Sequence, residues 1–423
     1  MKEYSVETKC VQAGYDPKNG EPRITPIVQS TAYKYDDVEE VGALFDLEKS
    51  GHFYSRISNP TVEVLENKIA ALEGGVGALG LSSGQAASLY AVLNICQAGD
   101  HIIAQNNIYG GTFTLLSSTI QKMGISSDFF GGDATVEEIQ KLIQPNTKLI
   151  FSESLTNPGV EVPDIRALAD LAHENGIPLI VDNTLATPYL CRPIEHGADI
   201  VVHSATKYLD GHATTVAGII VDSGNFPWSK EKFPVLTEED PNYHGLSYTK
   251  AFGRAAYITR ARVVLLRDLG STMSPFGAFL INLGCETLAL RMERHSENAL
   301  AVAKYLQGHP KVEWVSYPFL ESARDYENAK KYLKAGSGVI SFGVKGGKEE
   351  GAKFINALSL ATLVVHVGDI RTCALHPATM THRQLSEKDQ IAAGIQPNMV
   401  RLSVGIEAIE DIIQDLESAL EVV

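Results

Sequence analysis

Lys207 and Asp182 are the residues whose types and positions most directly suggest chemistry. Lys207 lies in the run Ser204-Ala205-Thr206-Lys207-Tyr208, just past an apolar run at 199–203, and Asp182 follows another apolar run at 177–181. Such runs predict strands, and a lysine and a carboxylate at the ends of two strands would be costly to bury without partners. A bound pyridoxal phosphate (PLP) would give both a role. The lysine amine can form a Schiff base with the PLP aldehyde, and the aspartate can pair with its ring nitrogen.

Neighbouring residues favour this functional interpretation over a structural one. Taken alone, Lys207 fits a solvated loop lysine, and Asp182 fits an N-cap for the turn that follows it. Hydroxyl groups at Ser204 and Thr206 can bind a phosphate next to the amine. The run Ser83-Gly84-Gln85 opens a predicted helix, and free N–H groups at a helix N-terminus bind phosphate. We therefore predict that these residues hold PLP.

Three more residues are candidates for contacts with cofactor or substrate. Tyr109 precedes two glycines after a predicted strand, which favours a ring stacked on a flat cofactor over a core aromatic. Arg401 lies inside an apolar run, and a buried guanidinium favours a bidentate anion such as a substrate carboxylate over a surface salt bridge. His203, His212 and His366 lack metal-ligand spacing. Two of them are predicted to be structural, the role of His366 stays open, and no metal is predicted.

Alternating strand and helix signals from residue 78 to about 221 predict the element that positions these residues. This alternation indicates an α/β fold with a mainly parallel sheet covered by helices on both faces. Ligands of such sheets bind beyond the carboxyl ends of the strands. The residues that fall just past a predicted strand end are Ser83, Tyr109, Asn157, Asp182, Ser204 and Lys207.

Three regions are expected along the chain. Residues 1–57 are irregular, with one short helix predicted near 38–47, and should pack on the body or on a neighbouring subunit. Residues 58–275 form the predicted large domain, which starts with a helix capped by Asn59 and contains a Pro- and aromatic-rich segment at 222–260. Residues 276–423 are expected to form a smaller C-terminal α/β domain.

Composition limits the classes of partner. The 423 residues carry a net charge of −15, which disfavours nucleic acid and anionic membranes as partners. Five cysteines without a CxxC pair support neither a disulfide framework nor a zinc site. The chain starts without an apolar leader and has no apolar run of membrane-spanning length, so a cytoplasmic location is expected.

The lysine motif resembles the hallmark of a known family. Ser204-Ala205-Thr206-Lys207-Tyr208 is similar to the motif of the cysteine/methionine-metabolism PLP enzymes, the trans-sulfuration family, and the resemblance spans nearly the whole chain. Within that family, the segment 222–260 and the runs 376–382 and 401–407 look like those of the O-acetylhomoserine sulfhydrylase subgroup. The resemblance implies an aspartate-aminotransferase-like fold (fold type I) with a large PLP-binding domain and a smaller C-terminal domain.

The resemblance also implies a reaction. It is a PLP-dependent γ-replacement on O-acetyl-L-homoserine by sulfide, or by a small thiol, that gives L-homocysteine, or methionine, and acetate. Lys207 would act as base and acid, with Tyr109 assisting, and Arg401 would bind the substrate α-carboxylate. The alternative within the family is a methionine or homocysteine γ-lyase that uses the same cofactor.

Further cofactor contacts follow from the resemblance alone. Asn157 would contact the phenolic oxygen, and Ser83, Gly84, Gln85, Ser204 and Thr206 would bind the phosphate. Tyr54 and Arg56 would reach the cofactor phosphate of a neighbouring subunit, which implies a homotetramer built as a dimer of dimers.

Two departures from the family pattern stand out. Gly111 occupies a position where methionine γ-lyases carry cysteine, which argues against the lyase. His366 stands near the α-carboxylate site, where a small polar residue is usual. Two other classes of protein are less consistent with the sequence. A nucleotide-dependent dehydrogenase would need a GxGxxG turn after the first strand and would leave Lys207 without a role. A non-catalytic binding protein would not need both Lys207 and Asp182.

Overall fold

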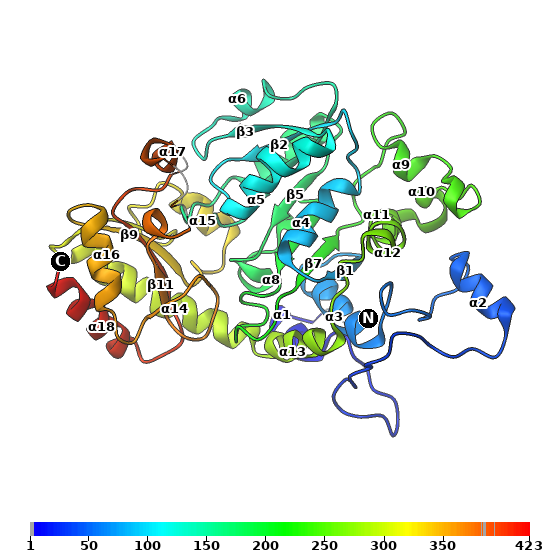
Figure 1. Cartoon of the computed structure of the whole chain (residues 1–423), viewed down its shortest axis with the longest axis horizontal. Helices are drawn as coiled ribbons and strands as arrows, with labels where there is room; N and C mark the ends of the chain where they lie inside the picture. Colours follow the sequence, from blue (N-terminus) through cyan, green and yellow to red (C-terminus); the bar gives the residue numbers. More distant parts are fainter. Residues whose placement is uncertain (1–3, 382, 384–385, 393) are drawn as a thin grey trace.

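The computed structural model describes residues 4–381, 383, 386–392 and 394–423. Two β-sheets organise the chain, with helices packed around each (Figure 1). No helix in this described part of the chain is long and apolar enough to cross a membrane.

The larger sheet has seven strands in the order β1-β7-β6-β5-β4-β2-β3. The strands from β6 to β3 are parallel, whereas β7 runs antiparallel to both of its neighbours. The strands are β1 (Gly77–Leu81), β2 (His101–Gln105), β3 (Ser126–Phe130), β4 (Thr147–Glu153), β5 (Leu179–Asp182), β6 (Ile200–Ser204) and β7 (Gly218–Asp222). The predicted fold class is thus confirmed, whereas the edge strand β3 and the antiparallel strand β7 were not predicted.

Helices cover both faces of this sheet because the strands are apolar on both sides. On one face, Val181 and Val201 pack in a core with the helices α3, α7 and α13; on the other, Ile180 and Val202 pack with α4 and α11. The bounds of these helices are α3 (Pro60–Glu73), α4 (Gly84–Leu93), α7 (Ile165–Glu174), α11 (Ala256–Arg260) and α13 (Pro275–Glu286). Shorter helices connect the strands: α5 (Gly110–Thr114), α6 (Val136–Gln140), α8 (Thr187–Leu190) and α12 (Arg267–Leu269).

The N-terminal region contains two helices. The predicted one is α2 (Val38–Phe45), which lies at the opposite end of the molecule from the C-terminus (Figure 1). The other, α1 (Val6–Gln12), was not predicted, and it buries Cys10 against the large-domain core. Helix α3 follows as predicted, because the Asn59 side chain accepts a hydrogen bond from the Thr61 N–H and Pro60 fits the first turn.

The segment 222–260 forms an aromatic cluster on the α4 side of the sheet. It contains α9 (Pro234–Thr237), α10 (Tyr248–Phe252) and α11. The Trp228 ring stacks on Tyr257 at 5.4 Å, and the Tyr257 hydroxyl donates to the Ala91 carbonyl of α4 at 2.8 Å. The segment therefore braces the helix whose N-terminus follows β1.

The smaller sheet has five strands in the order β10-β11-β12-β9-β8. It packs against the helices α14, α16 and α18 around a third core. The strands are β8 (Val312–Ser316), β9 (Val339–Val344), β10 (Thr362–Leu363), β11 (Cys373–Leu375) and β12 (Met399–Ser403). The helices are α14 (Leu288–Gly308), α15 (Tyr326–Tyr332), α16 (Lys348–Ala357), α17 (Glu387–Ala392) and α18 (Ile409–Glu421).

Candidate active site

A cavity of about 480 Å³ lies where the strand ends of the large sheet meet the segment 365–367 and β12 of the small sheet. All of the predicted site residues line it except Tyr54 and Arg56. Those that line it are Ser83, Gly84, Gln85, Tyr109, Asn157, Asp182, Ser204, Thr206, Lys207, His366 and Arg401. Convergence of residues from seven separate stretches of chain at one cavity makes it the candidate active site.

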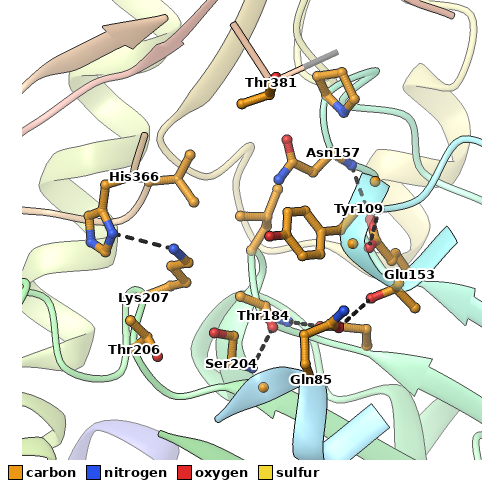
Figure 2. A pocket seen from close by; sticks show the side chains of 18 of the residues that line it. Gln85, Tyr109, Glu153, Asn157, Thr184, Ser204, Thr206, Lys207, His366 and Thr381 are labelled. Atoms are coloured by element: carbon orange, nitrogen blue, oxygen red, sulfur yellow. Dashed lines mark hydrogen bonds between the residues drawn. The ribbon is translucent and has the colours of Figure 1, made fainter. Parts of the chain in front are cut away.

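Lys207 projects into this cavity between Tyr109 and His366 (Figure 2). Its Nζ lies 3.3 Å from Nδ1 of His366. Burial, with the positive charge of Arg401 adding to it, lowers the pKa of the lysine from 10.5 to about 8. The amine is still mostly protonated at neutral pH, but its neutral, nucleophilic fraction is far larger than that of an ordinary lysine.

Asp182 ends β5 with one carboxylate oxygen accepting a hydrogen bond from the Thr184 N–H at 2.9 Å. Burial raises the pKa of this carboxyl. No lysine or arginine in the described residues forms an ion pair with it. A partly buried carboxylate without a cation is ready to take a cationic ligand group from the cavity.

Glu153, at the end of β4, is a cavity residue that the sequence interpretation missed. Its Oε1 accepts from the Tyr109 N–H at 2.8 Å, and its Oε2 accepts from the Asn157 N–H at 3.0 Å. Burial, and then the charge of Asp182, raises the pKa of this carboxyl well above its ordinary value. Glu153 thus holds two loops that both carry predicted site residues. An acidic residue closing a buried strand was the available signal.

The start of α4 forms a closely packed cradle. The Ser83 hydroxyl accepts from the Ala86 N–H at 3.1 Å, so Ser83 caps the helix. A Cβ on Gly84 would lie 2.6 Å from the Ser204 Cβ, so only glycine lets the helix N-terminus approach β6 this closely. The next residue, Gln85, accepts from the Thr112 hydroxyl at 3.2 Å. Free N–H groups at such a helix start favour an anion.

Two hydroxyls shape the opposite wall of the cradle. The Thr206 hydroxyl is paired with the Ala217 backbone, donating to its carbonyl at 3.2 Å and accepting from its N–H at 3.0 Å. Thr184, which the sequence interpretation did not single out, accepts from the Ser204 N–H at 2.8 Å. These bonds fix the loop that carries Lys207.

Arg401 reaches the cavity from β12. Its Nη1 donates to the Asn157 side chain at 3.1 Å, and its Nη2 donates to the His366 carbonyl at 3.0 Å. Burial lowers the pKa of the guanidinium to about 10, so it remains a cation at neutral pH. A partly buried cation without a carboxylate partner in the described residues is suited to an anionic substrate group.

Tyr109 is held by its backbone N–H, while the residue as a whole stays 48% exposed and lines the cavity. A Cβ on Gly111 would lie 2.6 Å from the Tyr109 Cε1 and 3.0 Å from the Gln85 amide nitrogen. Glycine at 111 therefore leaves the space that the tyrosine ring occupies.

Tyr54 and Arg56 lie away from this cavity. The Arg56 guanidinium stacks over the Tyr54 ring at 5.3 Å and donates to the Arg267 carbonyl. Tyr54 is 40% exposed. The chain does not bring this pair to its own Lys207.

Possible metal ligands and the run 376–382 are the remaining candidates from the sequence. The described residues contain no group of His, Cys, Asp and Glu side chains that could hold a metal ion. In the run 376–382, Thr381 lines the cavity, whereas His382 lies outside the described residues.

The side chains that line the cavity fit the chemical groups of PLP. Lys207 offers an amine with a lowered pKa, Asp182 offers a carboxylate without a protein cation, and the glycine-dependent start of α4 offers an anion site. These are complementary to an aldehyde, a pyridine nitrogen and a phosphate.

Comparisons with known proteins agree with this chemistry. A family model described as "Cys/Met metabolism PLP-dependent enzyme" matches residues 7–421. The chain is 46% identical to the O-acetyl-L-homoserine sulfhydrylase of Leptospira meyeri, over 99% of this chain and 97% of that protein. It is 48% identical to the homocysteine synthase of Schizosaccharomyces pombe, over 98% of each. A Campylobacter jejuni structure that contains N'-pyridoxyl-lysine-5'-monophosphate matches 99% of this chain and 100% of its own, with a TM-score of 0.95 and 37% identity.

Proposed function

The chain belongs to the Cys/Met metabolism family of PLP-dependent enzymes, and we propose on this basis that it catalyses γ-replacement on O-acetyl-L-homoserine. Sulfide, or a small thiol, takes the place of acetate and gives L-homocysteine, or methionine. One observation carries the proposal: the Lys207 amine and the Arg401 guanidinium face the same cavity beside the Asp182 carboxylate. The full-length similarity to relatives named for this activity supports the choice of substrate.

Each part of the cofactor has an assigned holder in this proposal. The start of α4 at Ser83, Gly84 and Gln85 binds the phosphate together with Ser204 and Thr206. Asp182 pairs with the ring nitrogen, the Tyr109 ring stacks on the cofactor, and Asn157 contacts the phenolic oxygen. When bound, PLP supplies an electron sink for the pair left at the substrate Cα. The anionic state of Asp182 is essential to that sink, since it keeps the ring nitrogen protonated.

Lys207 moves the protons of the reaction. With the cofactor and substrate bound, its free amine would remove the Cα proton and later return a proton to the product. The lowered pKa supports this role, because a base that titrates near pH 8 gives and takes protons readily at neutral pH. Lys207 would also take the Cβ proton as acetate leaves Cγ, and it would return a proton to Cβ when the sulfur nucleophile adds at Cγ.

Arg401 and Tyr109 orient the substrate in the cavity that Lys207 enters. The guanidinium is fixed by Asn157 and by the His366 carbonyl, and its remaining N–H groups bind the substrate α-carboxylate. Tyr109 faces Lys207 across the cavity, where its hydroxyl assists proton transfer and the departure of acetate (Figure 2).

The γ-lyase is disfavoured because Gly111 stands where methionine γ-lyases carry cysteine, and the packing around it leaves no room for that side chain. A cysteine there would place its Cβ 2.6 Å from the Tyr109 ring, so the ring could not keep its present position.

We further propose that two subunits share each active site in a homotetramer, with Tyr54 and Arg56 serving a neighbour. Support comes from their distance from the chain's own cavity and from their exposure. A cytoplasmic setting is also proposed, and the five cysteines, all buried and unpaired, suit a reducing compartment.

The deciding experiment is turnover of the PLP-loaded protein with O-acetyl-L-homoserine, with and without sulfide. Homocysteine and α-ketobutyrate are measured together. Homocysteine that forms only with sulfide, with little ketoacid, supports γ-replacement. Ketoacid that dominates even with sulfide present would assign the chain to the lyases instead.

A further inference from the structure

The contact between Lys207 and His366 joins residues 159 positions apart in sequence. Nδ1 of the imidazole lies 3.3 Å from the lysine Nζ, and the two side chains point toward each other in the cavity (Figure 2). Nε2 of the ring is buried and has no hydrogen-bond partner in the described residues. Among the described residues, Lys207 is therefore the only hydrogen-bond partner of this ring.

The backbone on both sides of the contact is fixed. The His366 carbonyl accepts from Arg401 at 3.0 Å, and its N–H donates to the Val364 carbonyl at 2.9 Å. Gly368 packs directly on the lysine backbone, because a Cβ there would lie 2.7 Å from the Tyr208 nitrogen. The backbone that carries the imidazole is thus held by hydrogen bonds and close packing beside Lys207.

The charges around the pair keep the imidazole neutral. Burial, and then the positive charge of Lys207, lowers the pKa of His366 to about 4. The other titratable groups that act on the two side chains are Arg401 from β12, Cys373 from β11, and Asp210 and Asp369 from the adjoining loops. A neutral imidazole offers a ring nitrogen that accepts hydrogen bonds.

We propose that His366 is a positioning residue for Lys207, whose Nδ1 accepts a hydrogen bond from the lysine whenever its amine is free and protonated. The inference rests on the proposed function, in which Lys207 carries the substrate proton between two steps. No proton leaves the lysine for the ring in this scheme. The imidazole holds the ammonium in place and stabilises it until its proton is delivered.

Two variants of matched shape test the hydrogen bond. His366→Asn places an amide oxygen close to where Nδ1 lies, whereas His366→Leu has the same branching and no acceptor. Both keep the backbone carbonyl that supports Arg401. His244→Asn is a control, because His244 is exposed and has a φ of 53°, a conformation that asparagine tolerates well.

The first measurement does not depend on activity. The full-length protein is freed of PLP, and the pH dependence of Lys207 labelling by acetic anhydride is followed by mass spectrometry. Loss of an acceptor destabilises the ammonium, so His366→Leu should lower the pKa of Lys207 by about one unit, and His366→Asn should restore it. An unchanged or raised pKa in the leucine variant would overturn the proposal.

The second measurement uses the PLP-loaded enzyme. The leucine variant should lower kcat about tenfold with little change in KM, and should shift the pH profile of kcat toward lower pH. The asparagine variant should recover most of both effects. Equal losses in the two variants would contradict a hydrogen-bonding role.

The two proposals fail separately. If the wild-type protein makes no homocysteine, the proposed reaction is wrong, whereas the labelling pKa still reports the contact. If homocysteine forms in all variants and the labelling pKa stays the same, the reaction stands and the role of His366 is wrong. Circular dichroism and PLP content show whether each variant is folded.

Discussion

Glu153 and Asp182 stand opposite each other in register at the carboxyl ends of the neighbouring parallel strands β4 and β5. Glu153 uses both oxygens on backbone N–H groups, whereas Asp182 uses one on Thr184. Burial raises the pKa of both carboxyls, and the charge of Asp182 adds to the effect on Glu153. Both effects favour the neutral carboxyl, and a cationic ring nitrogen bound beside Asp182 would offset them and stabilise its carboxylate.

Glu153→Gln should lower kcat about tenfold and cost about 1–2 kcal/mol in the free energy of unfolding. One acceptor oxygen becomes an amide N–H that faces another N–H, so the Tyr109 or the Asn157 loop loses its anchor. Urea unfolding and steady-state kinetics measure the two effects. The exposed Glu174→Gln is the matched control. A variant with wild-type kcat would show that Glu153 does not position Tyr109.

Gly84→Ala should weaken PLP binding at least about tenfold, because the new Cβ would lie 2.6 Å from the Ser204 Cβ and 2.9 Å from its Cα. The start of α4 must then move away from the cavity. Equilibrium dialysis of PLP measures the effect. Gly308→Ala is the control, since nothing lies within 4 Å of a Cβ at that position. Equal PLP affinity in the two variants would exclude a phosphate site at α4.

Arg401→Lys should raise KM for O-acetyl-L-homoserine by about 10–100-fold with a smaller change in kcat. Lysine keeps the charge but cannot hold Asn157, the His366 carbonyl and a carboxylate at once. Initial rates over a range of substrate concentrations separate the two constants. A loss confined to kcat would place the α-carboxylate elsewhere.

The stability of the PLP-free protein should depend on the pH through Lys207. Burial lowers the pKa of this amine from 10.5 to about 8, so the unfolded chain holds the proton more tightly than the folded one. The protonated amine therefore lowers the free energy of unfolding. This destabilisation is fully present below pH 8 and disappears as the pH rises toward 10.5. Lys207→Met should therefore be more stable than the wild type at neutral pH, with a gap that narrows at alkaline pH. Urea unfolding at several pH values, with the exposed Lys304→Met as control, tests this, and a constant gap would contradict it.

Shared active sites can be tested by mixing two inactive variants. Lys207→Ala should keep its fold and lose turnover by several orders of magnitude, and Arg56→Ala should lose most of its affinity for PLP. If Arg56 of one subunit serves the active site of its neighbour, co-expression creates some sites in which Lys207 and Arg56 are both intact. These sites should restore about a quarter of the wild-type activity. If purified hybrids recover no activity, Arg56 does not serve the active site of a neighbouring subunit.

The sequence predicts most of the cavity because strand ends are local signals. The apolar runs before Asp182 and Lys207 identify β5 and β6, and parallel strands bring their carboxyl ends to one edge. Arg401 is likewise predicted from a local signal, because it is a charged residue inside an apolar run. Roles that depend on the family, such as those of Tyr54 and Arg56, remain proposals.

The missed features depend on contacts between distant residues. Helix α1 is short and gains its stability from packing Cys10 into the core, which no local pattern reports. Glu153 becomes a site residue only through the turns at Tyr109 and Asn157, and the contact of His366 with Lys207 requires the small sheet to pack on the large one.

Helix α14 belongs to both cores. Its first turns, with Leu288 and Met292, pack beneath the large sheet, and its later turns, with Val302 and Leu306, pack beneath the small one. Lys207 and Arg401 therefore belong to two sheets whose cores share one continuous helix. A substitution buried in either core, far from the cavity, can therefore change the position of Arg401 relative to Lys207 and with it the affinity for substrate.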